Sequence, residues 1–158
     1  MTAEERLAKR LAEMGMEMPE AAAPKGLYRP VLIVDRMAYT SGHLPVEPNG
    51  QLITGRVGDA LDVEAAQRAA VLAGVGILVS LKAELGSLDR VRRVVKLLGM
   101  VNCTDDFTQQ PAVINGTSQL MADVFGTDNG VGARSAFGVN TLPLGVPVEV
   151  EAIFEIEP

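Results

Sequence analysis

Histidine and cysteine are nearly absent from this 158-residue chain, which has one of each, His43 and Cys103. A single cysteine excludes a disulfide within the chain and any cysteine-based metal cluster, and a single histidine argues against a histidine-rich metal site. We therefore expect no structural metal. Cys103 follows an apolar run, which is typical of a small buried side chain; a redox role is the less favoured alternative.

Aromatic residues and long apolar runs are also scarce. Phe and Tyr together make up 4% of the chain and Trp is absent, so the core has to be built from aliphatic side chains and Met. No run approaches the length of a membrane span, and the N-terminus lacks the basic-then-apolar order of a signal peptide. With 47% hydrophobic and 22% charged residues, the sequence predicts one globular cytoplasmic protein.

Positive charge is in deficit, with a formal net charge of −6. Such a chain repels a phosphate backbone, so nucleic-acid binding would need a concentrated basic patch. The best candidate is 90–96, where period-two alternation would place Arg90, Arg92 and Lys96 on one face and Arg93 and Val95 on the other. This pattern is typical of the solvated start of a strand, and we expect no nucleic-acid partner.

The N-terminal segment predicts a helix of its own. Thr2 and Glu5 have the spacing of a capping box, and apolar residues recur along one face of the segment that follows. Residues 20–26 are typical of a connector. We therefore divide the chain into an N-terminal helix with its connector, residues 1–26, and a domain, residues 27–158. The helix's apolar face could pack on that domain or bind a partner.

Strands and helices alternate along the rest of the chain. Asp62 and Gly86 have the positions of an N-cap and a C-cap around the longest helix. The predicted elements are strands at 31–34, 37–41, 91–103 and 146–155, and helices at 63–85 and 111–124. The polar pair Asp35-Arg36 between the first two strands predicts a tight hairpin. This order favours a two-layer α+β domain with both helices on one face of the sheet.

Two charged residues near the C-terminus lie in apolar surroundings. Between Phe125 and Val148 the only charges are Asp128 and Arg134, and an unpaired cation is costly to bury, so we expect an anionic group to meet Arg134. Glu149 follows in a strand of strict alternation. It lies on the polar face, where a carboxylate can be simply solvated or can be functional.

These residues belong to a pattern that resembles the RidA/YjgF family, the reactive-intermediate imine deaminases. The matching landmarks are, in chain order, Tyr28, the motif Thr40-Ser41-Gly42-His43-Leu44-Pro45, Asn115, and a C-terminal signature made of Ala133-Arg134-Ser135, Leu142-Pro143 and Val148 to Ile153. The resemblance covers the chain from Tyr28 to Ile156. It implies the chorismate-mutase-like fold, with a mixed sheet and two helices on one face, assembled as a homotrimer with ligand clefts between subunits.

The resemblance also implies an activity: hydrolysis of reactive 2-imino or 2-enamino acids to 2-keto acids and ammonia, with a small carboxylate as substrate, no cofactor and no membrane partner. Arg134 would hold the substrate carboxylate, because a guanidinium binds both oxygens in parallel. Glu149 would position or activate the attacking water, with the Tyr28 hydroxyl assisting.

The matched substrate-binding residues are Arg134, Ser41, Asn115 and Ala136. Each polar role has a structural alternative. Tyr28 could pack its ring at a strand entrance, Ser41 could be a turn residue, and Asn115 could bridge backbone within its helix. Arg134 could instead form an ion pair between subunits, including one with Glu149.

Several positions depart from the family pattern and indicate a divergent subfamily. His43 replaces a glutamine, Gly132 stands where a proline is common, and Ser118 occupies a helix position that is often aromatic. His43 could shuttle a proton in the cleft or serve as a hydrogen-bonding loop residue. Two other functions stay open: a trimer that binds small carboxylates without turnover, and a ribonuclease or translation inhibitor, which the acidic charge and the lack of a histidine pair disfavour.

Overall fold

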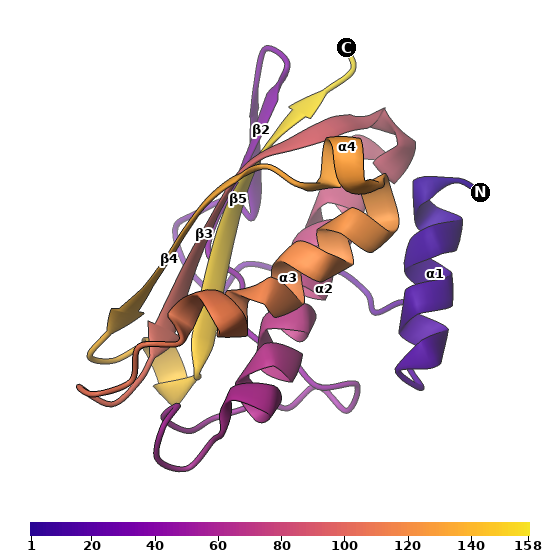
Figure 1. Ribbon diagram of the computed structural model, residues 1–158. Helices are drawn as coiled ribbons and strands as arrows, with labels where there is room; N and C mark the ends of the chain where they lie inside the picture. The colour runs from indigo at the N-terminus through magenta and orange to yellow at the C-terminus, as the bar shows by residue number, and fades with distance from the viewer.

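A five-stranded mixed sheet forms one layer and two long helices pack against one of its faces, as the sequence predicts (Figure 1). The computed structural model describes all residues, 1–158. The strands, in their order across the sheet, are β1 (Val31–Val34), β2 (Met37–Thr40), β5 (Val148–Ile156), β3 (Val91–Asn102) and β4 (Ala133–Val139). The helices are α1 (Ala3–Glu13), α2 (Val63–Leu85), α3 (Gln110–Phe125) and the single turn α4 (Thr127–Gly130), with 3₁₀ turns at Leu88–Arg90 and Pro143–Gly145.

Connections between the strands follow from their directions. β1 and β2 form the predicted antiparallel hairpin, and β5 pairs antiparallel with both β2 and β3. Only β3 and β4 are parallel, and α3 makes the long crossover that a parallel pair requires. β4 is the last strand in the sheet order, so it is an edge strand, and one row of its backbone groups faces away from the sheet.

The predicted ends of α2 are confirmed by its capping groups. The Asp62 carboxylate accepts a hydrogen bond from the Ala65 backbone N–H at 2.8 Å, and Gly86 adopts the left-handed conformation with φ 82°. Thr2 and Glu5 form both bonds of the predicted capping box. The capping residues are close in sequence to the helix ends that they cap, so the local sequence is sufficient to determine these ends of α1 and α2.

The expected period-two alternation at the start of β3 is wrong. Val94 and Leu97, three residues apart, are both buried, whereas Arg92 and Arg93 are both exposed. Two register shifts against β5 are responsible, between Val91 and Arg93 and between Val94 and Lys96. Each bulge inserts a residue that has no direct partner, so the side chains after it change faces.

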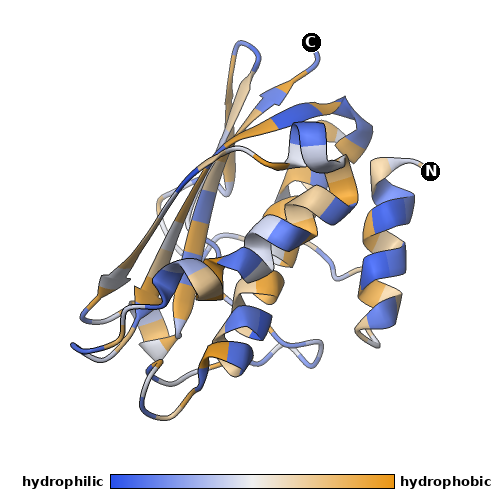
Figure 2. Ribbon diagram, viewed as in Figure 1, coloured by the Kyte–Doolittle hydropathy of each residue, from blue (hydrophilic) through white to orange (hydrophobic).

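Helix α1 packs outside α2 and α3 and belongs to the same core (Figures 1 and 2). Leu7 and Leu11 are fully buried. The Arg6 Nε donates to the Val124 carbonyl oxygen near the end of α3, and Glu4 forms an ion pair with Lys82 on α2 at 3.0 Å. The apolar face of α1 thus covers the helix layer of its own chain.

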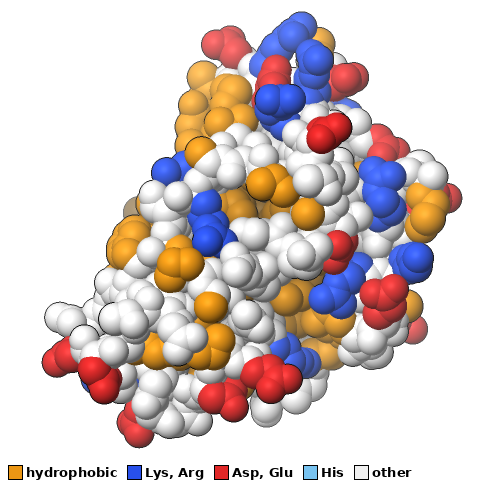
Figure 3. Space-filling view, in the orientation of Figure 1, with side chains coloured by type: hydrophobic (Ala, Val, Ile, Leu, Met, Phe, Trp, Pro, Cys, Tyr) orange, Lys and Arg blue, Asp and Glu red, His pale blue; other side chains and the backbone are white.

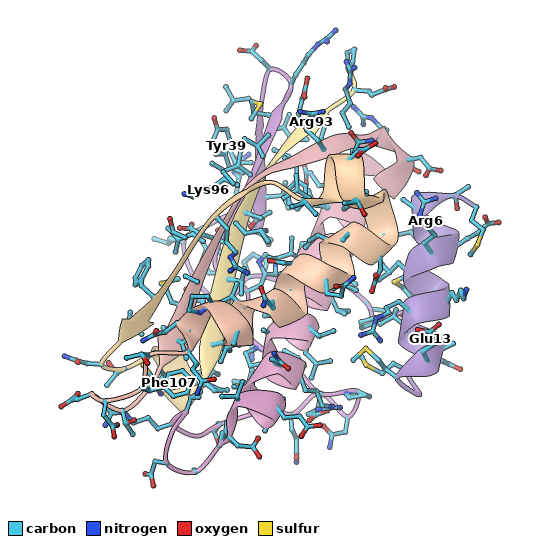
Figure 4. The ribbon with its side chains drawn as sticks, in the orientation of Figure 1. Arg6, Glu13, Tyr39, Arg93, Lys96 and Phe107 are labelled. Carbon is cyan, nitrogen blue, oxygen red and sulfur yellow. The ribbon has the colours of Figure 1, made fainter.

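The opposite face of the sheet carries no helix and exposes apolar side chains. A row across four strands is formed by Leu32, Tyr39, Ile153 and Lys96, which are neighbours in the strand registers. Tyr39 and Lys96 project from the side of the sheet away from the helices (Figure 4), and hydrophobic side chains border the sheet side of the molecule (Figure 3). Leu32 is 47% and Tyr39 41% exposed. No helix of the protein is both long and apolar enough to cross a membrane.

Candidate functional site

Arg134 lies on the edge strand β4 and reaches toward the helices. Its partner on β3 is the buried Leu97, and paired residues of neighbouring strands share a face of the sheet. The guanidinium Nη1 donates to the Asn115 side-chain oxygen at 2.7 Å and to the Ser118 hydroxyl at 3.1 Å, both on α3. The expected anion is not supplied by the chain: no carboxylate lies within ion-pair distance of Arg134.

Ser118 is a site residue that the sequence-based assignment missed. Asn115 and Ser118 are three residues apart on α3, so their side chains lie on the same side of the helix and can contact one guanidinium together. Its spacing from Asn115 and its departure from the family pattern were the two signals in the sequence, but neither was sufficient, because a serine in a helix has many solvated alternatives. Ala136, the other predicted binding residue on this strand, is two residues from Arg134 and pairs with Gly99.

Glu149 lies on β5 and points to the helix-free face. Its neighbours Val148 and Val150 are fully buried on the helix side, and the strand alternates without interruption. The carboxylate rests against Gly42, where an added Cβ would overlap it. Partial burial, and secondarily the charge of Glu151, raise the pKa of Glu149 above its ordinary value.

Ser41 and Tyr28 lie near the open end of the β1–β2 hairpin. The Ser41 hydroxyl donates to the Arg29 carbonyl oxygen at 2.6 Å and its N–H donates to the Pro30 carbonyl oxygen at 2.9 Å. Both bonds reach across the hairpin to the segment before β1, so Ser41 has a structural contact, but not that of a turn residue. These two bonds bring the segment after Tyr28 beside Ser41, and the Tyr28 ring is half exposed.

The His43 imidazole turns inward onto α2. One ring nitrogen, Nδ1, lies 2.7 Å from the Ser41 carbonyl oxygen, and the other, Nε2, lies 2.8 Å from the Ser80 hydroxyl. Burial lowers the pKa of this imidazole below 6.5, partly opposed by the bond to Ser41. A carbonyl only accepts, so Nδ1 carries the proton and Nε2 accepts from Ser80. A neutral ring with both nitrogens engaged matches the hydrogen-bonding alternative better than a proton shuttle.

The candidate residues therefore form two groups. The arginine half-site consists of Arg134 with Asn115 and Ser118; the glutamate half-site consists of Glu149 with the Ser41–Gly42 segment, which connects β2 to the His43–Val150 bridge. They lie on opposite faces of the sheet, with β3 between their strands. Within one chain the two half-sites do not meet. No three His, Cys, Asp or Glu side chains are grouped so that they could hold a metal ion.

Comparison with known proteins places this geometry in a family. The family model described as "YjgF/chorismate_mutase-like, putative endoribonuclease" matches residues 8–154. The chain belongs to the RidA/YjgF family. Its two-layer α+β architecture is accordingly the YjgF/chorismate-mutase-like fold, as the resemblance implied.

Named relatives within the family differ in what their names say. Protein TCP17 of Trypanosoma cruzi is 41% identical over 151 residues, which span 96% of this chain and 94% of that protein. The 2-iminobutanoate/2-iminopropanoate deaminase of Capra hircus is 36% identical over 135 residues, spanning 85% and 83%. The crystal structure of the protein Atu1372 from Agrobacterium tumefaciens, described as having unknown function, has a TM-score of 0.89 and 43% identity, and the match covers 98% of this chain and 95% of that one.

Proposed function

We propose that the protein hydrolyses reactive 2-imino and 2-enamino acids to 2-keto acids and ammonia. The observation that carries this proposal is the Arg134 guanidinium, which is held by two neutral oxygens and has no carboxylate partner. Because no carboxylate of the chain neutralises this guanidinium, its positive charge is available to bind an anionic ligand. Its planar fork of N–H donors fits both oxygens of a substrate carboxylate.

Glu149 is the proposed base of the reaction. Its raised pKa makes it a stronger base than an ordinary carboxylate. Water adds to the C=N carbon, one water proton passes to Glu149, and Glu149 delivers it to the imine nitrogen, which gives the carbinolamine. Glu149 then takes the hydroxyl proton of the carbinolamine and transfers it to the nitrogen, the C=O bond forms as the C–N bond breaks, and the 2-keto acid and ammonia leave. The step consumes one water and needs no cofactor.

A homotrimer is the assembly that we propose for this chemistry. The apolar row of Leu32, Tyr39 and Ile153 would be covered by neighbouring copies, because a large exposed apolar face is unusual in a monomer. The arginine half-site of one subunit would face the glutamate half-site of the next. Arg134 of one subunit and Glu149 of the next can then act on the same substrate, although the two residues lie on opposite faces of the sheet within each subunit.

Release of the 2-keto acid from imino acids generated in situ by an amino-acid oxidase tests the proposal. The wild-type protein should accelerate release, whereas Arg134→Ala and Glu149→Gln should each lose most of the acceleration. The matched controls are Arg92→Ala, an exposed arginine on the sheet, and Glu155→Gln, on the same face of β5 as Glu149. No acceleration by the folded wild-type protein across small and bulky imines would refute it.

A carboxylate-binding trimer without turnover is the second candidate, because the arginine half-site alone can hold an anion. It predicts binding of a stable 2-keto acid that needs Arg134 but not Glu149. The ribonuclease alternative is disfavoured by one further observation: the only imidazole is engaged by Ser41 and Ser80 and has no histidine partner.

A further inference from the structure

The His43 side chain connects the Ser41–Gly42 segment of the glutamate half-site to helix α2. The His43 backbone N–H donates to the Val150 carbonyl oxygen at 2.8 Å, and the Val150 N–H donates back to the His43 carbonyl oxygen at 3.1 Å. This two-bond bridge lies directly beside Glu149. The register of the Ser41–Gly42 segment against Glu149 is therefore set at His43.

The imidazole ties that bridge to α2. Its Nδ1–H donates to the Ser41 carbonyl oxygen and its Nε2 accepts from the Ser80 hydroxyl. The ring packs against Gly76, one helical turn before Ser80, where an added Cβ would stand 3.4 Å from the His43 Cδ2, in ordinary van der Waals contact. One ring thus joins α2, the Ser41–Gly42 segment and β5.

Gly42 transmits the position of the Ser41–Gly42 segment to the carboxylate. The Glu149 side chain lies against Gly42, in the space that any Cβ at Gly42 would fill. A shift of this segment would therefore change both the direction and the burial of the carboxylate. The hydrogen-bond partners of the imidazole are a carbonyl and a hydroxyl, neither of them ionisable, so its influence on Glu149 is geometric.

We propose that His43 and Ser80 are positioning residues, which hold the Ser41–Gly42 segment on α2 and thereby fix the Glu149 carboxylate for activation of the attacking water. The proposal rests on the deaminase function proposed above for Glu149. Neither residue needs to touch the substrate: Ser80 orients the imidazole, the imidazole orients the Ser41–Gly42 segment, and this segment limits the carboxylate to one place.

Removal of the Ser80 hydroxyl should loosen this chain of contacts without opening the core. In Ser80→Ala we expect kcat for imine hydrolysis to fall roughly tenfold to a hundredfold, as for a small misplacement of a reacting group. KM should change little, because Arg134 still binds the carboxylate. Ser80→Thr, which keeps a hydroxyl, should restore kcat.

Asp62→Ala is the matched control, because it destabilises the same helix by loss of its N-cap at the far end from Ser80. It should lower the thermal midpoint and leave kcat at the wild-type level. Equal loss of kcat in Ser80→Ala and Asp62→Ala would show that only helix stability matters and would overturn the proposal, as would a failure of Ser80→Thr to restore kcat.

A second readout does not depend on turnover. Titration of the Glu149 carboxyl carbon by ¹³C NMR should give a lower pKa in Ser80→Ala than in the wild type, because the displaced carboxylate is better solvated. An unchanged Glu149 titration overturns the positioning role. If the wild-type protein hydrolyses no imine, the proposed function fails by itself, and this titration still decides whether His43 and Ser80 position Glu149.

Discussion

Arg134 and Glu149 point to opposite faces of one sheet. Arg134 pairs with Leu97 on β3 and bonds to α3, whereas Glu149 pairs with Met100 on β3 and points away from the helices. A substrate held by Arg134 of one chain is therefore out of reach of Glu149 of the same chain. The proposed chemistry requires that the two residues come from different copies.

Mixed oligomers test this separation. Co-expression of Arg134→Ala chains with Glu149→Gln chains should restore activity that each variant lacks alone. If the two chains mix at random, about a quarter of the sites will combine an intact arginine with an intact glutamate, and activity should approach that fraction of the wild-type rate. Co-expression of Arg134→Ala with the Arg134→Ala/Glu149→Gln double variant should restore nothing. A mixture as inactive as this control would place both residues in one chain's site.

Gly42→Ala should displace the Glu149 carboxylate while the fold is retained. The added Cβ overlaps the end of a flexible side chain and not backbone, so the carboxylate moves aside at little cost to stability. We expect kcat to fall at least tenfold, with a circular-dichroism spectrum and thermal midpoint close to wild type. The Gly42→Ala/Glu149→Gln double variant should be no worse than Glu149→Gln, because both changes remove the same function. If the two substitutions instead lowered kcat independently, so that their effects added, the result would contradict the contact between Gly42 and Glu149.

Helix α1 should contribute to the stability of the whole domain. Leu11 is fully buried between α1 and the rest of the core, so Leu11→Ala should lower the free energy of unfolding by about 2–5 kcal/mol. Lys9→Ala, on the exposed side of the same helix, is the control and should change it little. Urea unfolding of the two variants measures the difference. Equal stability of both would mean that α1 is held only loosely.

His43 should make stability depend on pH in a defined direction. Burial lowers its pKa, so the unfolded chain takes up the proton first as the pH falls. The stability from the neutral imidazole is complete above its unfolded pKa of 6.5 and is lost as the pH falls from there through the lowered folded pKa. His43→Gln should therefore show a flatter dependence of the unfolding free energy between about pH 7.5 and pH 5. Parallel curves for the two proteins would show that the ring is not buried neutral.

Much of the fold could be predicted because its signals are local. The caps of α1 and α2, the β1–β2 hairpin and the alternation of β5 depend on residues close in sequence, and the structure confirms them. The strand alternation around Val94 could not be predicted, because a bulge depends on how β3 fits β5 rather than on β3 alone.

The candidate site shows the same division. The sequence by itself determined which residue types were present: a lone arginine in an uncharged stretch, a glutamate on the polar face of an alternating strand, and a single histidine. Only the tertiary structure decided that Arg134 meets the neutral Asn115 and Ser118, that His43 meets Ser80, and that the two half-sites lie on opposite faces. These contacts join segments far apart in the chain. Such contacts depend on sheet order and helix packing, and one-dimensional spacing carries no signal for either.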